Sequence, residues 1–398
     1  MMVMKFSSFV ERIGGEGAAA WNIHSRAVER LRRGEDVILL SVGDPDFDTP
    51  APITDAAIAS LRAGNTHYTS VVGEPELRRV IAARHRRSTS QEAGPEQVIV
   101  LAGAQCGLFS AALCILEPGD EIVVPEPMYV TYEAVIGATG ARLVTVPLRS
   151  ERHFHLDPRD LAAAVTGRTR AVLLNSPHNP TGAVLTREAV EAVAEICIRH
   201  DLWLISDEVY ASLAYDRPFV SPCGLPGMAE RTVTVNSLSK SHAMTGWRLG
   251  WAVTPPEMVE HMANLALCML YGCPGFVQDA AVVALEAELQ EVAMMREAYR
   301  SRRDLVCERL GSVPGLRCHR PEGGMFVMLD VRDTGQSAYA FSEGLLEVAG
   351  VSVLAGDAFG PSAAGHVRLS LGVSEEALRT ACDRIADYVA SGSRRSSA

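Results

Sequence analysis

The sequence predicts an α/β protein in which a large domain, built on a mainly parallel sheet between helices, is followed by a smaller α/β domain. Short runs rich in valine, isoleucine and leucine alternate with stretches whose apolar residues recur at helical spacing. Continuous apolar runs of this kind are typical of parallel strands that helices bury on both faces. In the large domain we expect strands at residues 98–102, 121–124, 142–147, 171–174, 202–206 and 232–236.

The elements on either side of these strands define the expected domains. One long helix is expected around residues 281–310, where Leu285, Tyr299 and Leu310 keep roughly one face. Further strands are expected at 37–42, 326–331, 351–354 and 367–371, and further helices at 54–62, 74–87, 337–349 and 375–390. We therefore expect an N-terminal arm with part of the small domain at 1–45, a large domain at 46–290 and a small C-terminal domain at 291–398.

Composition and charge exclude several classes of function. The chain has 398 residues, and 47% of them are apolar and 21% charged, as in an ordinary globular protein. Its formal net charge of −11 argues against a nucleic-acid surface. No apolar run approaches the ~18 residues of a membrane span. The nine cysteines are scattered without a C-x-x-C pair, which is typical of reduced thiols in a cytoplasmic protein.

The basic residues are almost all arginines. Of the 37 lysines and arginines, two are lysines, Lys5 and Lys240. Arginine stays charged at every accessible pH, whereas a buried lysine can lose its proton and attack a carbonyl. Composition alone leaves drift as an equal alternative. The residues around Lys240 therefore have to decide whether it is a nucleophile.

Polar residues follow three of the expected strands directly. The runs at 171–174, 202–206 and 232–236 lead into Asn179, into Asp207 and Tyr210, and into Lys240. Because the carboxyl ends of parallel strands meet in one crevice, we expect these four side chains to lie together. An amide, a carboxylate, a phenol and an amine around one cleft form an unusual chemical set.

Pyridoxal phosphate accounts for each member of this set. Lys240, as the catalytic residue, would form a Schiff base with the cofactor aldehyde. Asp207 would keep the pyridine nitrogen protonated, which makes the ring an electron sink. Tyr210 and Asn179 would hydrogen-bond the ring oxygen beside the imine.

The phosphate of this cofactor needs hydrogen-bond donors. They are expected from the side chains of Ser237, Ser239 and Arg248 and from the backbone amides of Gly103, Ala104 and Gln105. The amides open an expected helix, whose positive end suits an anion. Tyr129 is expected to stack on the ring face.

The motifs that contain these residues resemble those of the class I/II aminotransferases, whose fold is that of the fold type I pyridoxal-phosphate transferases. The similarity spans about residues 10–385, and the motifs occur in the order and at the spacing of the family. They include Gly43-x-Pro-Asp-Phe-x-Thr-Pro50, Pro177-x-Asn-Pro-Thr-Gly182, Asp207-Glu-Val-Tyr210, Ser237-x-Ser-Lys240, Gly246-Trp-Arg248 and His366-Val-Arg-Leu-Ser370. Each motif is weak alone, but their joint occurrence in order makes coincidence negligible.

The resemblance implies further roles and a second subunit. Members of this family are homodimers, which implies that Tyr68 reaches the phosphate in the neighbouring site. Arg368 would clamp the α-carboxylate of the substrate, with help from Asn179 and the backbone of Gly43. Lys240 would also move the proton between the α-carbon of the substrate and the cofactor.

Several stretches are similar to family members that transfer the amino group of L-arginine to pyruvate. They are Gly17–Trp21, Leu40–Pro52, Glu126–Ala134, Asn236–Trp247 and Ala355–Gly365. The resemblance thus implies 5-guanidino-2-oxopentanoate and L-alanine as products. A guanidinium side chain needs a carboxylate and an apolar wall. We hypothesise that Glu16 and Trp21 supply them, because in relatives this arm lies over the active site.

Other functions stay open beside this one. An aspartate, aromatic or broad-specificity aminotransferase would share the family motifs, and a pyridoxal-phosphate lyase would use the same fold and lysine. The pair Ser237-x-x-Lys240 also fits a serine acyl-enzyme, but neither lysine lies in the K-T-G motif of that class. His153-x-His155 has the spacing of a metal pair, yet no further ligand cluster is evident from the sequence, so no metal site is expected.

Overall fold

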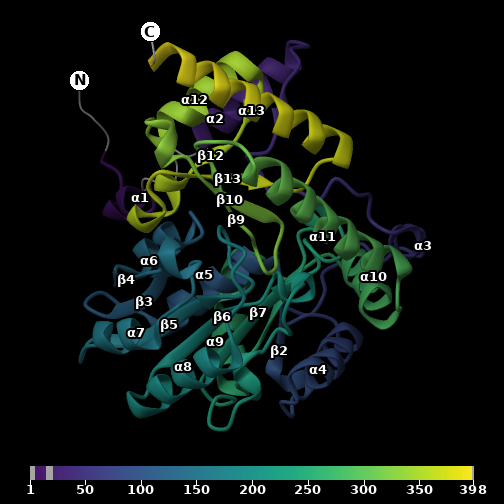
Figure 1. The fold of residues 1–398 in the computed structure, drawn as a ribbon. Helices are drawn as coiled ribbons and strands as arrows, with labels where there is room; N and C mark the ends of the chain where they lie inside the picture. Colours follow the sequence, from purple (N-terminus) through teal and green to yellow (C-terminus); the bar gives the residue numbers. More distant parts are fainter. Residues whose placement is uncertain (1–4, 15–20, 397–398) are drawn as a thin grey trace.

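The computed structural model describes residues 5–14 and 21–396. Its largest sheet has seven strands in the order β2-β8-β7-β6-β5-β3-β4 (Figure 1). The strands are β2 (Val98–Leu101), β3 (Glu121–Glu126), β4 (Arg142–Pro147), β5 (Thr169–Asn175), β6 (Trp203–Asp207), β7 (Thr232–Ser237) and β8 (Gly250–Val253). All neighbouring pairs from β7 to β4 are parallel, and β8 is antiparallel to β2 and β7. The structure therefore confirms the expected α/β fold and the six strands expected for the large domain.

Helices cover both faces of this sheet, as the continuous apolar runs predict. Along β5, Leu173 packs into one core, while its neighbours Val172 and Leu174 pack into the core on the other face. Helices α5, α6 and α9 contribute to the first core, and α7 and α8 to the second. These helices are α5 (Ala104–Ile115), α6 (Tyr132–Thr139), α7 (Pro158–Ala164), α8 (Arg187–Arg199) and α9 (Pro256–Met269).

A second sheet lies beside the large one, above it in Figure 1. It has four antiparallel strands in the order β12-β13-β10-β9, and a two-stranded parallel pair of β1 and β11 accompanies it. The strands are β1 (Ile38–Leu39), β9 (Arg317–His319), β10 (Phe326–Asp330), β11 (Val351–Ser352), β12 (Leu354–Ala355) and β13 (His366–Ser370). The domain boundaries after residues 45 and 290 stay a prediction.

The remaining helices pack around these sheets. They are α1 (Ser8–Arg12), α2 (Trp21–Arg32), α3 (Ala51–Arg62), α4 (Pro75–Thr89), α10 (Gly275–Glu286), α11 (Gln290–Gly311), α12 (Ala338–Ala349) and α13 (Glu375–Ser396). None of the described helices has both the length and the apolar character required to cross a membrane.

The prediction of one long helix around residues 281–310 is wrong, because the chain forms two helices there. Leu285 of α10 packs into the core that includes β2 and β8, whereas Tyr299 and Leu310 of α11 pack into the core of the small sheet. Ala287, just after α10, is extended. One straight helix cannot fill two separate cores, so the chain turns between them.

Strand β8 was absent from the sequence-based prediction. It is four residues long, starts with glycine and follows the Lys240 loop without an intervening α-helix. These properties give little periodicity from which a strand can be predicted.

Candidate active site

The side chains expected from the strand ends line one cavity of about 180 Å³. Strand register explains the meeting, because Asn175 of β5 is level with Asp207 of β6, which is level with Val235 of β7. The loops that leave these strands therefore start at the same edge of the sheet. The predicted site residues that line the cavity are Ala104, Gln105, Tyr129, Asn179, Asp207, Tyr210, Ser237, Ser239, Lys240 and Arg248.

Lys240 projects from the loop after β7 and is largely buried. Its Nζ donates a hydrogen bond to the carbonyl oxygen of Gly43 at 2.6 Å. Burial, together with the nearby cations Arg368 and Arg248 and against the opposing effect of Asp44, lowers the pKa of Lys240 to about 8. A neutral amine is therefore accessible near physiological pH, as a nucleophile requires.

Asp207 is a buried carboxylate at the end of β6. Its Oδ2 accepts a hydrogen bond from Tyr132 Oη at 2.6 Å, and its Oδ1 accepts one from the amide of Val209 at 3.3 Å. Burial raises the pKa of Asp207 to about 6. Among the described residues, no cationic side chain forms an ion pair with it. An unpaired buried carboxylate fits a ligand that brings a positive charge, such as a protonated pyridine nitrogen.

Tyr210 and Asn179 line the cavity together with Asp207. The backbone amide of Asn179 donates to Asn175 Oδ1 at 2.7 Å, and Asn175 Nδ2 donates to the Asp207 carbonyl oxygen at 3.0 Å. Burial raises the pKa of the Tyr210 phenol above its ordinary range. Tyr210 therefore stays protonated and can donate to an anionic ring oxygen.

The same cavity also gathers hydrogen-bond donors for an anion. Helix α5 begins at Ala104, so its first amides have no partner within the helix and point along its positive end. Gly103 has a φ of +81°, and a Cβ there would lie 2.6 Å from Arg248 Nη2. A side chain at this position would be strained by the positive φ and would displace the guanidinium from the helix start. Together with the hydroxyls of Ser237 and Ser239, the donors fit a phosphate group.

Arg368 enters the site from β13 of the small sheet. Its Nη1 donates to Asn179 Oδ1 at 2.9 Å and its Nη2 to the Ser41 carbonyl oxygen at 2.8 Å, while its buried Nε has no partner. The guanidinium stacks on the Phe326 ring at 4.0 Å. Within the described part of the chain, no carboxylate pairs with this cation. Arg368 thus offers a buried, incompletely bonded positive charge to an anionic substrate.

Neither Tyr68 nor Trp21 lines the cavity. Tyr68 is 87% exposed, and its ring lies 4.8 Å from that of Tyr271, so it does not reach the site of its own chain. Trp21 is partly buried against an apolar cluster that includes Tyr129 and Phe359. Glu16 lies outside the described residues.

The site also contains residues that were not predicted from the sequence. Tyr132 bonds the Asp207 carboxylate, and Asn175 holds the Asn179 loop. Ser41 and Phe359 contact Arg368. Asn175, directly after an expected strand and two residues before Pro177, was detectable by the same reasoning as Asp207. Tyr132 lies at the start of α6, and no pattern in the sequence links it to β6.

Comparisons with known proteins agree on one family. The family model for aminotransferase class I and II matches residues 35–385. The arginine–pyruvate transaminase AruH of Pseudomonas aeruginosa is 63% identical over 383 residues, which cover 96% of this chain and 98% of that protein. The aspartate/prephenate aminotransferase of Thermus thermophilus is 41% identical over 92% of this chain and 94% of that protein. The structure of the Thermus thermophilus aspartate aminotransferase with maleate superposes with a TM-score of 0.92 at 39% identity, and covers 97% of this chain and 100% of that one.

Proposed function

The chain belongs to the class I and II aminotransferases, and from this premise we propose that it transfers the α-amino group of L-arginine to pyruvate, giving 5-guanidino-2-oxopentanoate and L-alanine. The observation that carries the proposal is 63% identity, over almost the whole of both chains, to a transaminase named for these two substrates. Relatives named for aspartate or prephenate are less similar, at 41% identity or below. An aminotransferase of this class uses pyridoxal phosphate as its cofactor.

The cofactor supplies an aldehyde that captures amino groups and a protonated ring that withdraws electrons from the α-carbon of the substrate. The residues of the cavity would hold it at its ring nitrogen, its ring oxygen and its phosphate. Asp207 would pair with the ring nitrogen, and Tyr210 and Asn179 would donate to the ring oxygen. Arg248, the two serines and the start of α5 would hold the phosphate.

Lys240 would have two tasks in this reaction. As a neutral amine it would hold the cofactor covalently. Its Nζ would also accept the proton from the α-carbon of the donor and return it in the next part of the reaction. Its buried position and lowered pKa support both tasks, because a general base works best when its pKa is near the working pH.

The pH dependence of cofactor attachment tests the environment of Lys240. In the cofactor-free protein, the lowered pKa leaves Nζ protonated below about pH 8 and neutral above it. The rate of attachment should rise about tenfold per pH unit below pH 8 and level off above it. Absorbance during reconstitution measures this rate. A rate that keeps rising to pH 10, as for an ordinary lysine, would contradict the burial argument.

Arg368 would bind the α-carboxylate that amino donors and keto-acid acceptors share. Replacing it with glutamine should lower kcat/KM for L-arginine and for pyruvate on the order of a hundredfold, because a buried charge pair loses one partner. Arg368→Lys should lose less, since it keeps the charge without the planar fork. Steady-state kinetics with each substrate varied measures the effect. A loss confined to L-arginine would instead indicate that Arg368 binds the side chain of L-arginine rather than its α-carboxylate.

We propose that Glu16 and Trp21 select L-arginine among the amino donors. The contact of Trp21 with the cluster around Tyr129 and Phe359 supports a wall for the methylene groups, because Tyr129 lines the cavity and Phe359 stacks on Arg368. Glu16→Gln should lower kcat/KM for L-arginine at least about tenfold, through loss of a charge-assisted bond. The half-reaction with L-alanine, which needs no acceptor and is followed by cofactor absorbance, is the control and should keep its rate. Equal losses for both donors would refute this role of Glu16.

We propose a homodimer in which Tyr68 serves the neighbouring site. The support is that Tyr68 and Tyr271 form an exposed aromatic pair, 87% and 52% exposed, which is unusual unless a partner covers it.

The nine cysteines, all within the described ranges, form no disulfide, which supports a reducing compartment such as the cytoplasm.

The function is tested by a visible spectrum of the purified protein, followed by a panel of amino donors with pyruvate. We expect a coloured protein and the highest kcat/KM with L-arginine. A protein that takes up no pyridoxal phosphate would overturn the assignment entirely. A preference for aspartate or aromatic donors would refute L-arginine as the donor, while the assignment as an aminotransferase would still hold. Release of ammonia or pyruvate without a keto-acid acceptor would favour a lyase.

A further inference from the structure

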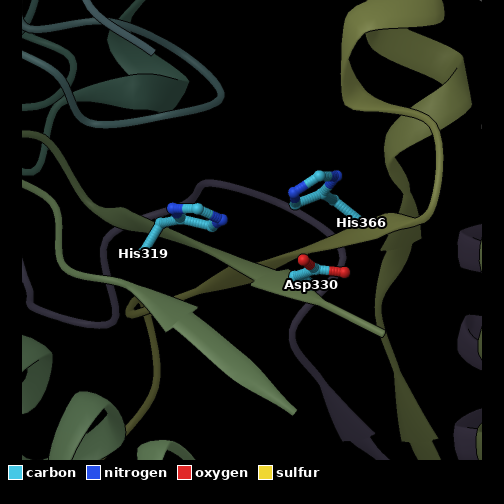
Figure 2. A group of neighbouring side chains, drawn as sticks. All are labelled: His319, Asp330 and His366. Carbon is cyan, nitrogen blue, oxygen red and sulfur yellow. The ribbon is translucent and has the colours of Figure 1, made fainter. Parts of the chain in front are cut away.

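Three side chains with metal-binding atoms come together on the small sheet, outside the cavity that holds Lys240. They are His319 of β9, Asp330 of β10 and His366 of β13, and Figure 2 shows them on neighbouring strands. Asp330 is directly opposite His366 in the register of these strands, and His319 is opposite Met328 on the same face. One potential donor atom from each of the three residues lies within 4.8 Å of the others.

His366 is held in a tautomer that can bind a metal through Nε2. His366 is 1% exposed, and its Nδ1 lies 3.1 Å from the carbonyl oxygen of Ala364. A carbonyl only accepts, so Nδ1 carries the proton and Nε2 carries a lone pair. Across the described residues, Nε2 of His366 and Nε2 of His319 are both buried without a hydrogen-bond partner.

Burial also keeps both rings neutral. It lowers the pKa of His366, and it lowers the pKa of His319 to about 4. Leaving two imidazole nitrogens buried and unbonded costs free energy, since polar groups in the interior are normally paired. A bound ion would remove that cost.

Asp330 supplies an oriented carboxylate beside the two rings. Its side chain is almost fully buried, yet hydrogen bonds from Arg332 outweigh burial and lower its pKa. Arg332 Nε donates to Asp330 Oδ1 at 3.0 Å and Nη2 donates to Oδ2 at 2.7 Å. The backbone amide of Arg332 also donates to Oδ1 at 3.0 Å, so these bonds fix the carboxylate and leave a lone pair of Oδ2 free.

The surroundings close the cluster on one side. The ring of Phe154 packs edge-on against both imidazoles, with centroids 5.1 Å from His319 and 5.5 Å from His366. The ring of His153 lies 6.5 Å from His319 on an exposed turn. The cluster therefore combines an apolar cover with a further imidazole at its rim.

We propose that His319, Asp330 and His366 bind a divalent transition-metal ion of the zinc type. Two imidazole nitrogens and one carboxylate oxygen suit zinc, cobalt or nickel, whereas calcium and magnesium require oxygen ligands. Donors around a tetrahedral ion at ~2.1 Å lie roughly 3.4 Å apart, so small side-chain rotations complete the shell. A water molecule or His153 takes the fourth position.

The site would be structural rather than catalytic. His366 is two residues before Arg368 on β13, so both side chains project from the same face of the strand. An ion that ties β13 to β9 and β10 would fix the strand from which Arg368 reaches the substrate. The sequence led us to expect no metal site, because the only histidine pair with metal-like spacing was His153-x-His155. The residues of the cluster come from three separate strands and form no short motif.

Equilibrium dialysis of the chelator-treated holoenzyme against Zn²⁺, with metal and protein quantified, tests the proposal. The wild-type chain should bind one more ion than His319→Gln or Asp330→Asn, and each variant should lose at least about a hundredfold in affinity at this site. His200→Gln, which removes an exposed histidine, is the matched control and should bind like the wild type. A rise in Tm on addition of Zn²⁺ should appear in the wild type and the control and be absent from both variants.

Equal stoichiometry and affinity in all four proteins would overturn the proposal, as would the absence of Zn²⁺ binding by the wild type. Far-ultraviolet circular dichroism and the cofactor spectrum check that the variants fold. Because His319 is only partly buried, His319→Gln decides the question if Asp330→Asn does not fold. The readout is bound metal rather than amino transfer, so the result is independent of the proposed reaction.

Discussion

Replacing Lys240 with arginine should abolish amino transfer while pyridoxal phosphate still binds noncovalently. Arginine keeps the positive charge but cannot become a neutral nucleophile or accept a proton from the α-carbon. Loss of the acid–base function alone costs ~10²–10⁴-fold, and the covalent anchor is lost as well. We therefore expect kcat with L-arginine and pyruvate to fall at least about 10⁴-fold. The visible spectrum should change from that of a lysine-bound cofactor to that of the free aldehyde.

The chain offers a matched control for this experiment. Lys5 is its only other lysine, and it is exposed in the N-terminal segment. Lys5→Arg should leave the rate, the spectrum and cofactor retention unchanged. Full activity in Lys240→Arg, or loss of the lysine-bound spectrum in Lys5→Arg, would mean that the wrong lysine has been identified.

The fold was predictable wherever local pattern and burial agree. The parallel strands are buried on both faces, so each appears in the sequence as an apolar run between helices. The same logic predicted the site, since Asn179, Asp207, Tyr210 and Lys240 follow strands that end at one edge. Arg368 was identified through its motif, and its inward position on β13 has a physical reason in the ring of Phe326 beneath it.

Features that depend on contacts between distant segments escaped prediction. The break between α10 and α11 arises because the two helices fill different cores, which their periodicity does not record. Tyr132 reaches Asp207 from an element 75 residues away. The cluster of His319, Asp330 and His366 depends on the pairing of β9, β10 and β13, and strand pairing is not written in any short stretch of sequence.

Replacing Asp207 with asparagine should be the most damaging change that leaves the covalent anchor intact. An amide cannot stabilise a protonated ring nitrogen as a carboxylate does, so the ring loses its capacity to withdraw electrons from the α-carbon. Loss of one electrostatic group in a buried site costs on the order of 10²–10³-fold in kcat. We expect at least that loss in kcat with L-arginine and pyruvate, while reconstitution still gives the lysine-bound spectrum.

Tyr132→Phe is the matched control, because it removes the hydrogen bond to Asp207 and leaves the carboxylate in place. Its kcat should fall roughly tenfold, which corresponds to about 1.4 kcal/mol of the 1.5–3 kcal/mol typical of bonds to charged groups. The loss in kcat should be larger for Asp207→Asn than for Tyr132→Phe. If Asp207 had a merely structural role, both substitutions would act through stability. If Asp207→Asn keeps kcat within tenfold of the wild type, the ring nitrogen has another partner. The fold would then bury a carboxylate without a cation and gain no catalysis from it, which the cost of burying an unpaired charge makes hard to explain.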